Sequence, residues 1–213
     1  MRKSGQNELL FQLMLDEKWV ILGAVLNFSG TATYLIETLK GKVKPNKMTW
    51  LLWALAPLVA FSAEISQGVG LQSLLTFMVG FGPLLIFIAS FINKEAYWKI
   101  SRLDYFCGGF SVLGLLLWAT TKNGNLAIAF SILADGLAGV PTIIKSWRAP
   151  ETENATVFLL AGISALITLL TIDVWNFEHY AFPAYILLIC ALLFSLIRFR
   201  LGKKLDEGVI DRG

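Results

Sequence analysis

Long apolar runs alternate with short polar segments along the chain, and each run is about as long as a bilayer is thick. A helix needs about 20 apolar residues to cross the hydrocarbon core, and it satisfies its own backbone hydrogen bonds there. The pattern predicts an all-α membrane protein with transmembrane helices, of which the second and sixth are short. The predicted spans are residues 19–39, 48–64, 70–92, 103–120, 125–147, 155–172 and 180–201.

The composition favours a multi-pass membrane protein over a soluble helical one. Of the 213 residues, 56% are hydrophobic and 15% are charged, whereas a soluble domain carries about a quarter charged residues. Cys107 and Cys190 both lie in apolar runs, so we expect them to pack as small apolar side chains and not to form a disulfide. The single histidine, His179, excludes a multi-histidine metal site.

The lysines and arginines predict the orientation, because cytoplasmic loops carry an excess of them. Among the 18 basic residues, only Arg2, Lys3, Lys18 and Lys122 fall on the side of the predicted amino terminus. The remainder fall in the alternate loops and in the carboxyl-terminal tail. We therefore expect a plasma (inner) membrane protein with its amino terminus outside and its carboxyl terminus in the cytoplasm. The net charge of +3 carries no indication of nucleic acid, since these residues gather at helix ends.

The spans group as three, one and three, which predicts an internal repeat. Each triplet has a charged hinge after its first span and a short neutral turn after its second, and polar positions fall in step: Asn27 with Asp135, and Thr49 with Thr156. Both triplets enter from the same side, so these are parallel repeats joined by an inverting linker helix. The predicted segments are a polar or amphipathic amino-terminal stretch (1–17), the first repeat (18–93), linker helix 4 (94–121), the second repeat (122–201) and a cytoplasmic tail (202–213).

The hinge from residue 141 to residue 156, PTIIKSWRAPETENAT, resembles the proline–glutamine loop of the PQ-loop superfamily, which includes the SWEET sugar facilitators. Pro141 would end one helix, Lys145 and Arg148 would follow it, and Thr156 would start the next. The SWEET-like layout of three, one and three spans covers nearly the whole chain. Thr142 stands where that superfamily has glutamine, so the resemblance implies the architecture and not a sugar substrate.

Asp135 lies about ten residues from either end of its span, near the predicted midplane, where a charge costs several kcal/mol. The corresponding face of the first span carries Asn27, Thr31 and Tyr34. Two hypotheses stay open. These residues form a small polar binding cavity between the repeats, or Asn27 and Asp135 lock two helices together through a buried hydrogen bond.

The second span adds Trp50 and Trp53 at helical spacing, and the sixth adds Ser164. An indole offers a flat apolar wall and one hydrogen-bond donor, which suits a flat polar solute. The favoured interpretation of Trp50 is an anchor at the membrane interface. For Trp53, a role in a binding pocket and a role in helix packing carry equal weight. Glu64 is interpreted as a solvated charge at a helix end, and Asp104 as the partner of Arg102 in a boundary ion pair.

Proline within a helix weakens its hydrogen bonding and permits kinks. Such kinks would let the two bundles rock, as alternating access requires. The candidate hinge residues are Pro57, Pro83, Pro141 and Pro183, of which Pro83 and Pro183 correspond between the repeats.

The sequence has no nucleophile, base and acid at catalytic spacing, no phosphate-binding loop and no metal-binding motif, so we expect neither an enzyme nor a cofactor. The expected partners are the lipid bilayer and an unidentified small polar solute, with no nucleic acid; a homo-oligomer stays open. The favoured function is a transporter or facilitator for a sugar-like or vitamin-like solute, in which Asp135 would carry a coupling proton. The alternative is a non-transporting membrane receptor or assembly protein.

Overall fold

The computed structural model of the chain describes residues 15–92 and 123–202, and between them residues 99–102, 104–106, 109, 116 and 120. The predicted span at 103–120 falls mostly outside the described residues. The described part is all-helical, without strands, which confirms the predicted class. Its elements are α2 (Trp19–Leu39), α3 (Lys47–Ser66), α4 (Ser73–Ala89), α6 (Gly124–Arg148), the short 3-10 turn η1 (Pro150–Thr152), α7 (Ala155–Leu170) and α8 (Phe177–Phe199).

Four of these helices, α2, α3, α6 and α8, are long and apolar enough to cross a membrane. Helices α4 and α7 are equally apolar but shorter, with 17 and 16 residues. A rise of about 1.5 Å per residue makes these two roughly 25 Å long, slightly less than the hydrocarbon thickness. The observed helix ends fall within three residues of the predicted ones, because charged residues and asparagines bound the apolar runs.

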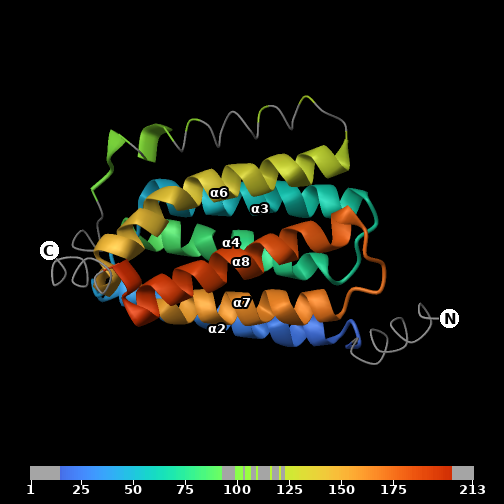
Figure 1. Cartoon of the computed structure of the whole chain (residues 1–213), viewed down its shortest axis with the longest axis horizontal. Helices are drawn as coiled ribbons and strands as arrows, with labels where there is room; N and C mark the ends of the chain where they lie inside the picture. Colours follow the sequence, from blue (N-terminus) through green and yellow to red (C-terminus); the bar gives the residue numbers. More distant parts are fainter. Residues whose placement is uncertain are drawn as a thin grey trace, which may run out of the picture.

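The helices run side by side along the long axis of the molecule, and α4 and α8 occupy its middle (Figure 1). Helix α4 packs against both α2 and α3, and α8 packs in the same way against both α6 and α7. Between these two sets, α2 lies against α7 and α3 lies against α6. Exchanging α2 with α6, α3 with α7 and α4 with α8 therefore reproduces the same pattern of neighbours.

Asparagine caps begin the second helix of each set. The side-chain oxygen of Asn46 accepts hydrogen bonds from the backbone N–H groups of Met48 and Thr49. The side-chain oxygen of Asn154 accepts from those of Thr156 and Val157. Such a cap satisfies N–H groups that have no partner inside the helix. Each hinge thus ends in the same local structure, although the sequences of the two hinges differ.

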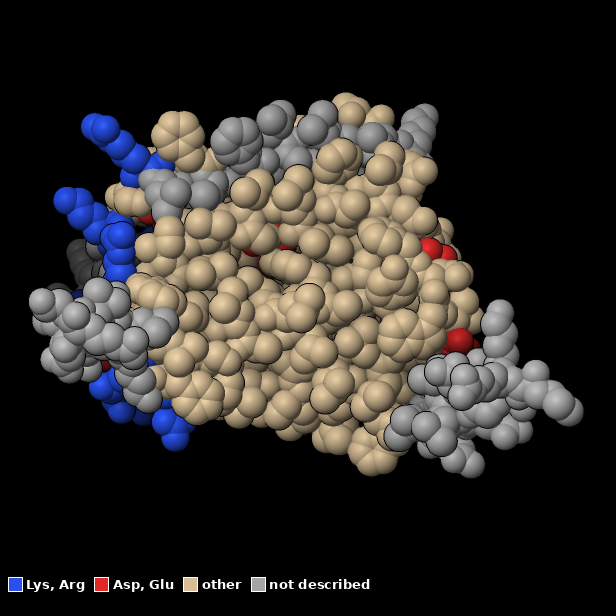
Figure 2. Space-filling model, viewed as in Figure 1, with Lys and Arg blue, Asp and Glu red and all other residues tan. Residues whose placement is uncertain are grey.

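The belt between the two ends of the bundle is mostly apolar in this view, and the acidic atoms seen there lie in a hollow near its middle (Figure 2). Large apolar side chains are exposed on this belt, among them Val25, Phe28, Ile88, Leu133 and Leu188. Lys and Arg gather at the end that carries the α2–α3 and α6–α7 hinges, and in this view the opposite end shows Asp and Glu but no Lys or Arg among the coloured residues. An exposed apolar belt of this kind is the surface that lipid chains cover.

Candidate functional site

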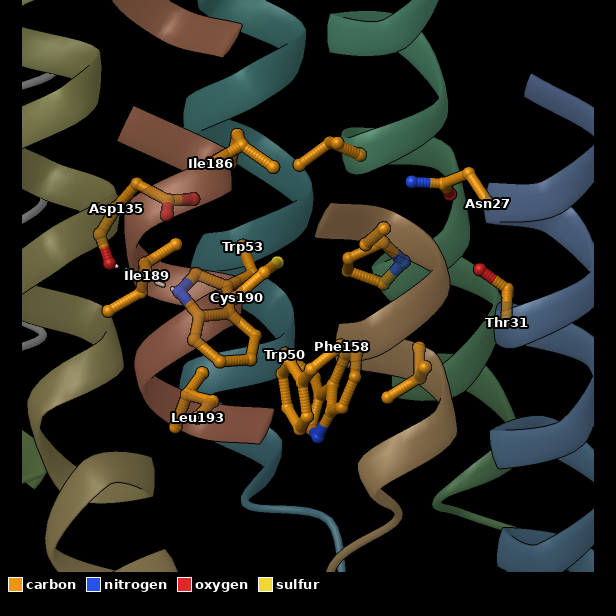
Figure 3. Close-up of a pocket in the computed structure, with 14 residues that line it drawn as sticks. Asn27, Thr31, Trp50, Trp53, Asp135, Phe158, Ile186, Ile189, Cys190 and Leu193 are labelled. Atoms are coloured by element: carbon orange, nitrogen blue, oxygen red, sulfur yellow. Dashed lines mark hydrogen bonds between the residues drawn. The ribbon is translucent and has the colours of Figure 1, made fainter. Parts of the chain in front are cut away.

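A cavity of about 60 Å³ lies between the two sets of helices (Figure 3). Its lining residues come from α2, α3, α4, α6, α7 and α8. Most of its wall is aliphatic or aromatic. The polar side chains come from α2 and α6, and the indoles come from α3. Its lining residues from these helices are Asn27, Thr31, Trp50, Trp53 and Asp135, and α4, α7 and α8 add Val79, Pro83, Val157, Phe158, Ala161, Ile186, Ile189, Cys190 and Leu193.

The structure brings together five of the six side chains that the sequence suggested for a binding site: Asn27, Thr31, Trp50, Trp53 and Asp135. Ser164 is not among them. It is buried between helices, and a Cβ atom added to Gly23 of α2 would lie 3.0 Å from its hydroxyl oxygen. Ser164 therefore belongs to the α2–α7 packing surface.

Of the four candidate hinge prolines, only Pro83 lines the cavity. Pro57, Pro141 and Pro183 are buried inside α3, α6 and α8, away from the cavity wall. On α8 the lining positions are Ile186, Ile189, Cys190 and Leu193, so Pro183 itself is not part of the cavity wall.

Asp135 is the acidic residue of the cavity, and its side chain points into it from α6 (Figure 3). One carboxylate oxygen, Oδ2, accepts a hydrogen bond of 2.6 Å from the Tyr185 hydroxyl of α8. The other, Oδ1, is buried and has no hydrogen-bond partner among the described residues. The hydrogen bond from Asn27 to Asp135, which was one of the two open hypotheses, is absent among the described residues, and Tyr185 is the partner of Asp135 instead.

Trp53 is bound to the same turn of α6, because its indole N–H donates to the backbone oxygen of Asp135 over 3.1 Å. Gly139, one turn further along α6, leaves room for this ring, since a Cβ atom there would lie 3.2 Å from the indole. Trp53 therefore lines the cavity and also joins α3 to α6 through a hydrogen bond. Its orientation depends on a small residue at position 139.

An aromatic cluster lines the cavity on the side of the basic end of the bundle. The rings of Trp50 and Trp53 have centroids 5.3 Å apart, and those of Trp53 and Phe158 are 6.1 Å apart, each pair edge to face. Tyr34 packs on Trp50 with a centroid separation of 4.6 Å. Trp50 is 2% exposed, so its interpretation as an interfacial anchor is wrong.

A buried network of charged and polar groups lies beyond the aromatic cluster, at the two hinges. The Lys145 ammonium contacts Glu153 Oε1 over 2.6 Å, and the Tyr34 hydroxyl donates to Glu153 Oε2 over 2.8 Å. Lys145 also donates to the backbone oxygen of Lys44 in the other hinge. We call Tyr34, Lys44, Lys145 and Glu153 the hinge network. It ties α2, α6 and both hinges together.

Glu64 and Asp104 are both buried, although the sequence suggested a solvated helix-end charge for Glu64 and a boundary ion pair for Asp104. Glu64 accepts a hydrogen bond of 3.0 Å from the Thr76 hydroxyl and is 2% exposed, so it is not a solvated helix end. Asp104 accepts from the Asn46 side chain and from the backbone N–H and hydroxyl of Ser101. The described ion pairs do not join Asp104 to Arg102.

Sequence reasoning missed Tyr185, Glu153 and Phe158. Tyr185 stands out as a hydroxyl within the apolar run of α8, which is a usable signal. Glu153 lies in a polar hinge, where burial has no sequence signature. Phe158 is one of many aromatic residues in the apolar runs, and only packing separates it from the others.

Within the described part of the chain, no group of three or more His, Cys, Asp or Glu side chains is arranged to hold a metal ion. Comparisons of the chain with protein-family profiles, with curated proteins and with solved structures find no match.

Proposed function

We propose that this chain is a membrane transporter or facilitator that moves a small polar solute by alternating access through the central cavity. The observation that carries the proposal is the position of Asp135. Its carboxylate lies in the middle of the membrane-length helix α6, inside a cavity that both sets of three helices line. Ionisable groups inside a membrane are costly, and they mark solute and ion pathways more often than they serve packing.

The proposed mechanism rests on a duplicated architecture of two parallel three-helix repeats joined by a linker helix, as in PQ-loop and SWEET-like proteins. The equivalent packing of α2, α3 and α4 with α6, α7 and α8 supports this. The paired caps Asn46 and Asn154 support it as well. Transporters with repeats of this kind bind solute at the repeat interface, near the bilayer midplane.

The basic end of the bundle is the proposed cytoplasmic side, following the excess of Lys and Arg there. On that side the aromatic cluster of Trp50, Trp53 and Phe158 and then the hinge network lie between the cavity and the end of the bundle. Because the hinge network joins both halves, we infer that it must separate before solute reaches the cytoplasm. It is the proposed inner gate.

The size of the cavity supports a change of shape during transport. A water molecule needs about 10–15 Å³ measured in the same way, so a cavity of about 60 Å³ holds only a few heavy atoms. A larger solute requires the two bundles to move apart. Pro83 lines the cavity and lies inside α4, where proline weakens helix hydrogen bonding, so it is the proline best placed to permit that movement.

Accessibility of a cavity-lining cysteine from both faces of the membrane tests the proposal. In a background that lacks Cys107 and Cys190, we expect Ala161→Cys to react with a membrane-impermeant methanethiosulfonate in both right-side-out and inside-out vesicles. Ala161 lines the cavity. The matched control is Ala165→Cys, one turn along the same helix and fully buried away from the cavity, which we expect to react from neither side. Reaction of Ala161→Cys from one face only, or from neither, would contradict alternating access.

A further inference from the structure

We propose that the transported solute is a small organic cation and that it exchanges for one proton on Asp135. This inference rests on the transport function proposed above and specifies its substrate class and its coupling. It is carried by the carboxylate of the cavity, by the aromatic rings beside it and by the lack of basic side chains among the described residues of the wall.

Asp135 offers a cation a ready acceptor. Its Oδ2 is engaged by Tyr185, but its Oδ1 is buried without a partner in the described residues. The described residues of the cavity wall include no lysine, arginine or histidine. An ionised Asp135 would therefore lack a protein counter-charge in the cavity, and a bound ammonium group would supply it. An anionic solute would meet only repulsion at the same place.

The remainder of the wall also suits an organic cation. Trp50, Trp53 and Phe158 form one side of the cavity, and aromatic rings attract ammonium groups through their negative faces. Asn27 and Thr31 face the cavity from α2, and the described residues supply no hydrogen-bond partner to either side chain. The Thr31 hydroxyl can accept or donate a hydrogen bond, and the Asn27 amide, whose nitrogen points toward the cavity in Figure 3, can do both through its two polar atoms. A cavity that combines one carboxylate with aromatic rings and neutral polar groups favours a cation with an apolar body.

The coupling follows from the cost of closing the cavity around an unpaired charge. Removing an isolated carboxylate from water costs several kcal/mol, so the bundles close readily only when Asp135 carries a proton or a cation. Both ligands need the same carboxylate and exclude each other. One proton therefore leaves Asp135 when one monovalent cation binds, and the exchange is electrically neutral.

The groups around Asp135 leave it as the single exchangeable site in the described cavity wall. From α8, the ionisable groups that face it are Tyr185 and Cys190. From α3, Trp53 contacts its backbone and does not titrate. The residues that α2, α4 and α7 contribute to the wall are neither charged nor titratable. The second buried carboxylate, Glu64, belongs to a different site beside Thr76.

Proton release from purified full-length protein tests the exchange. In weakly buffered solution near neutral pH, we expect at least one of three permanently charged probes, tetramethylammonium, choline and N-methylpyridinium, to release about one proton per cation bound. In the wild-type protein the apparent Kd should rise about tenfold for each unit of acidification, as competition for one site requires. Asp135→Asn should abolish the release, Asp135→Glu should retain it, and Glu64→Gln should leave it unchanged.

Transport in proteoliposomes completes the test. A proton gradient directed outward should drive accumulation of the bound cation at least tenfold above the level reached with Asp135→Asn. Binding of none of the probes, or binding without proton release in the wild-type protein, would overturn the inference. If Ala161→Cys reacts from both faces and neutral solutes move without protons, the transport function stands and the cation–proton exchange fails. If Ala161→Cys reacts from neither face, both proposals fail.

Discussion

Replacing Lys145 by methionine is expected to lower the free energy of unfolding by about 3–5 kcal/mol, because it leaves the carboxylate of Glu153 buried without its ammonium partner. Lys145 is 1% exposed, and its contact with Glu153 measures 2.6 Å. Tyr34 would remain as a hydrogen-bond donor to Glu153, but a hydroxyl does not neutralise a charge. The loss should appear as a lower melting temperature of the purified protein in detergent.

Two further variants separate this effect from a general loss of charge at the basic end. The double variant Lys145→Met with Glu153→Gln removes both charges, and we expect it to recover most of the lost stability. Lys42→Met is the matched control, since Lys42 is exposed in the other hinge, and a surface substitution of this kind changes stability by about 0.5 kcal/mol or less. A double variant that is no more stable than Lys145→Met would contradict the described pairing.

Replacing Trp53 by alanine is expected to cost about 3–5 kcal/mol, the range for removing a large buried aromatic side chain. Trp53 is 7% exposed and contacts the rings of Trp50 and Phe158. The substitution also removes the indole N–H that donates to the backbone oxygen of Asp135. It should therefore weaken the α3–α6 contact as well as the cavity wall. Thermal unfolding monitored by tryptophan fluorescence or by aggregation measures the loss.

Trp53→Phe divides that loss into its parts. Phenylalanine keeps most of the ring packing and loses the donor, so we expect a cost of about 1 kcal/mol, the net worth of a typical hydrogen bond. Trp19→Ala is the control for tryptophan content, because Trp19 is 47% exposed on the apolar belt at the start of α2. Equal destabilisation by Trp53→Ala and Trp19→Ala would show that Trp53 has no special place in the core.

The positions of the helices could be predicted from the sequence because the bilayer imposes a length on each apolar run. The run at 19–39 is bounded by Lys18 and Lys40, and α2 has the same limits. The polar residues Asn27 and Asp135 were found in the same way. Each is out of place in an apolar run, and both line the cavity.

The surroundings of each residue could not be predicted in this way, since a hydropathy pattern gives depth in the membrane but not the neighbours. Charges in a hinge are expected in solvent, yet Lys145 and Glu153 are buried because the two hinges fold against each other. Glu64 is within one turn of its helix end, but α4 covers it and supplies Thr76. Ser164 had the right helical phase for the cavity and faces α2 instead.

The distances between the two sets of helices at each end of the bundle test the central claim most directly. Spin labels at exposed Lys42 and Arg148 report on the basic end, and labels at Ser66 and Trp175 report on the opposite end. In nanodiscs, pulsed electron paramagnetic resonance should resolve two distances for each pair. Glu153→Gln, which weakens the hinge network, should favour the longer distance at the basic end and the shorter one at the other. A single unchanged distance at both ends would contradict alternating access.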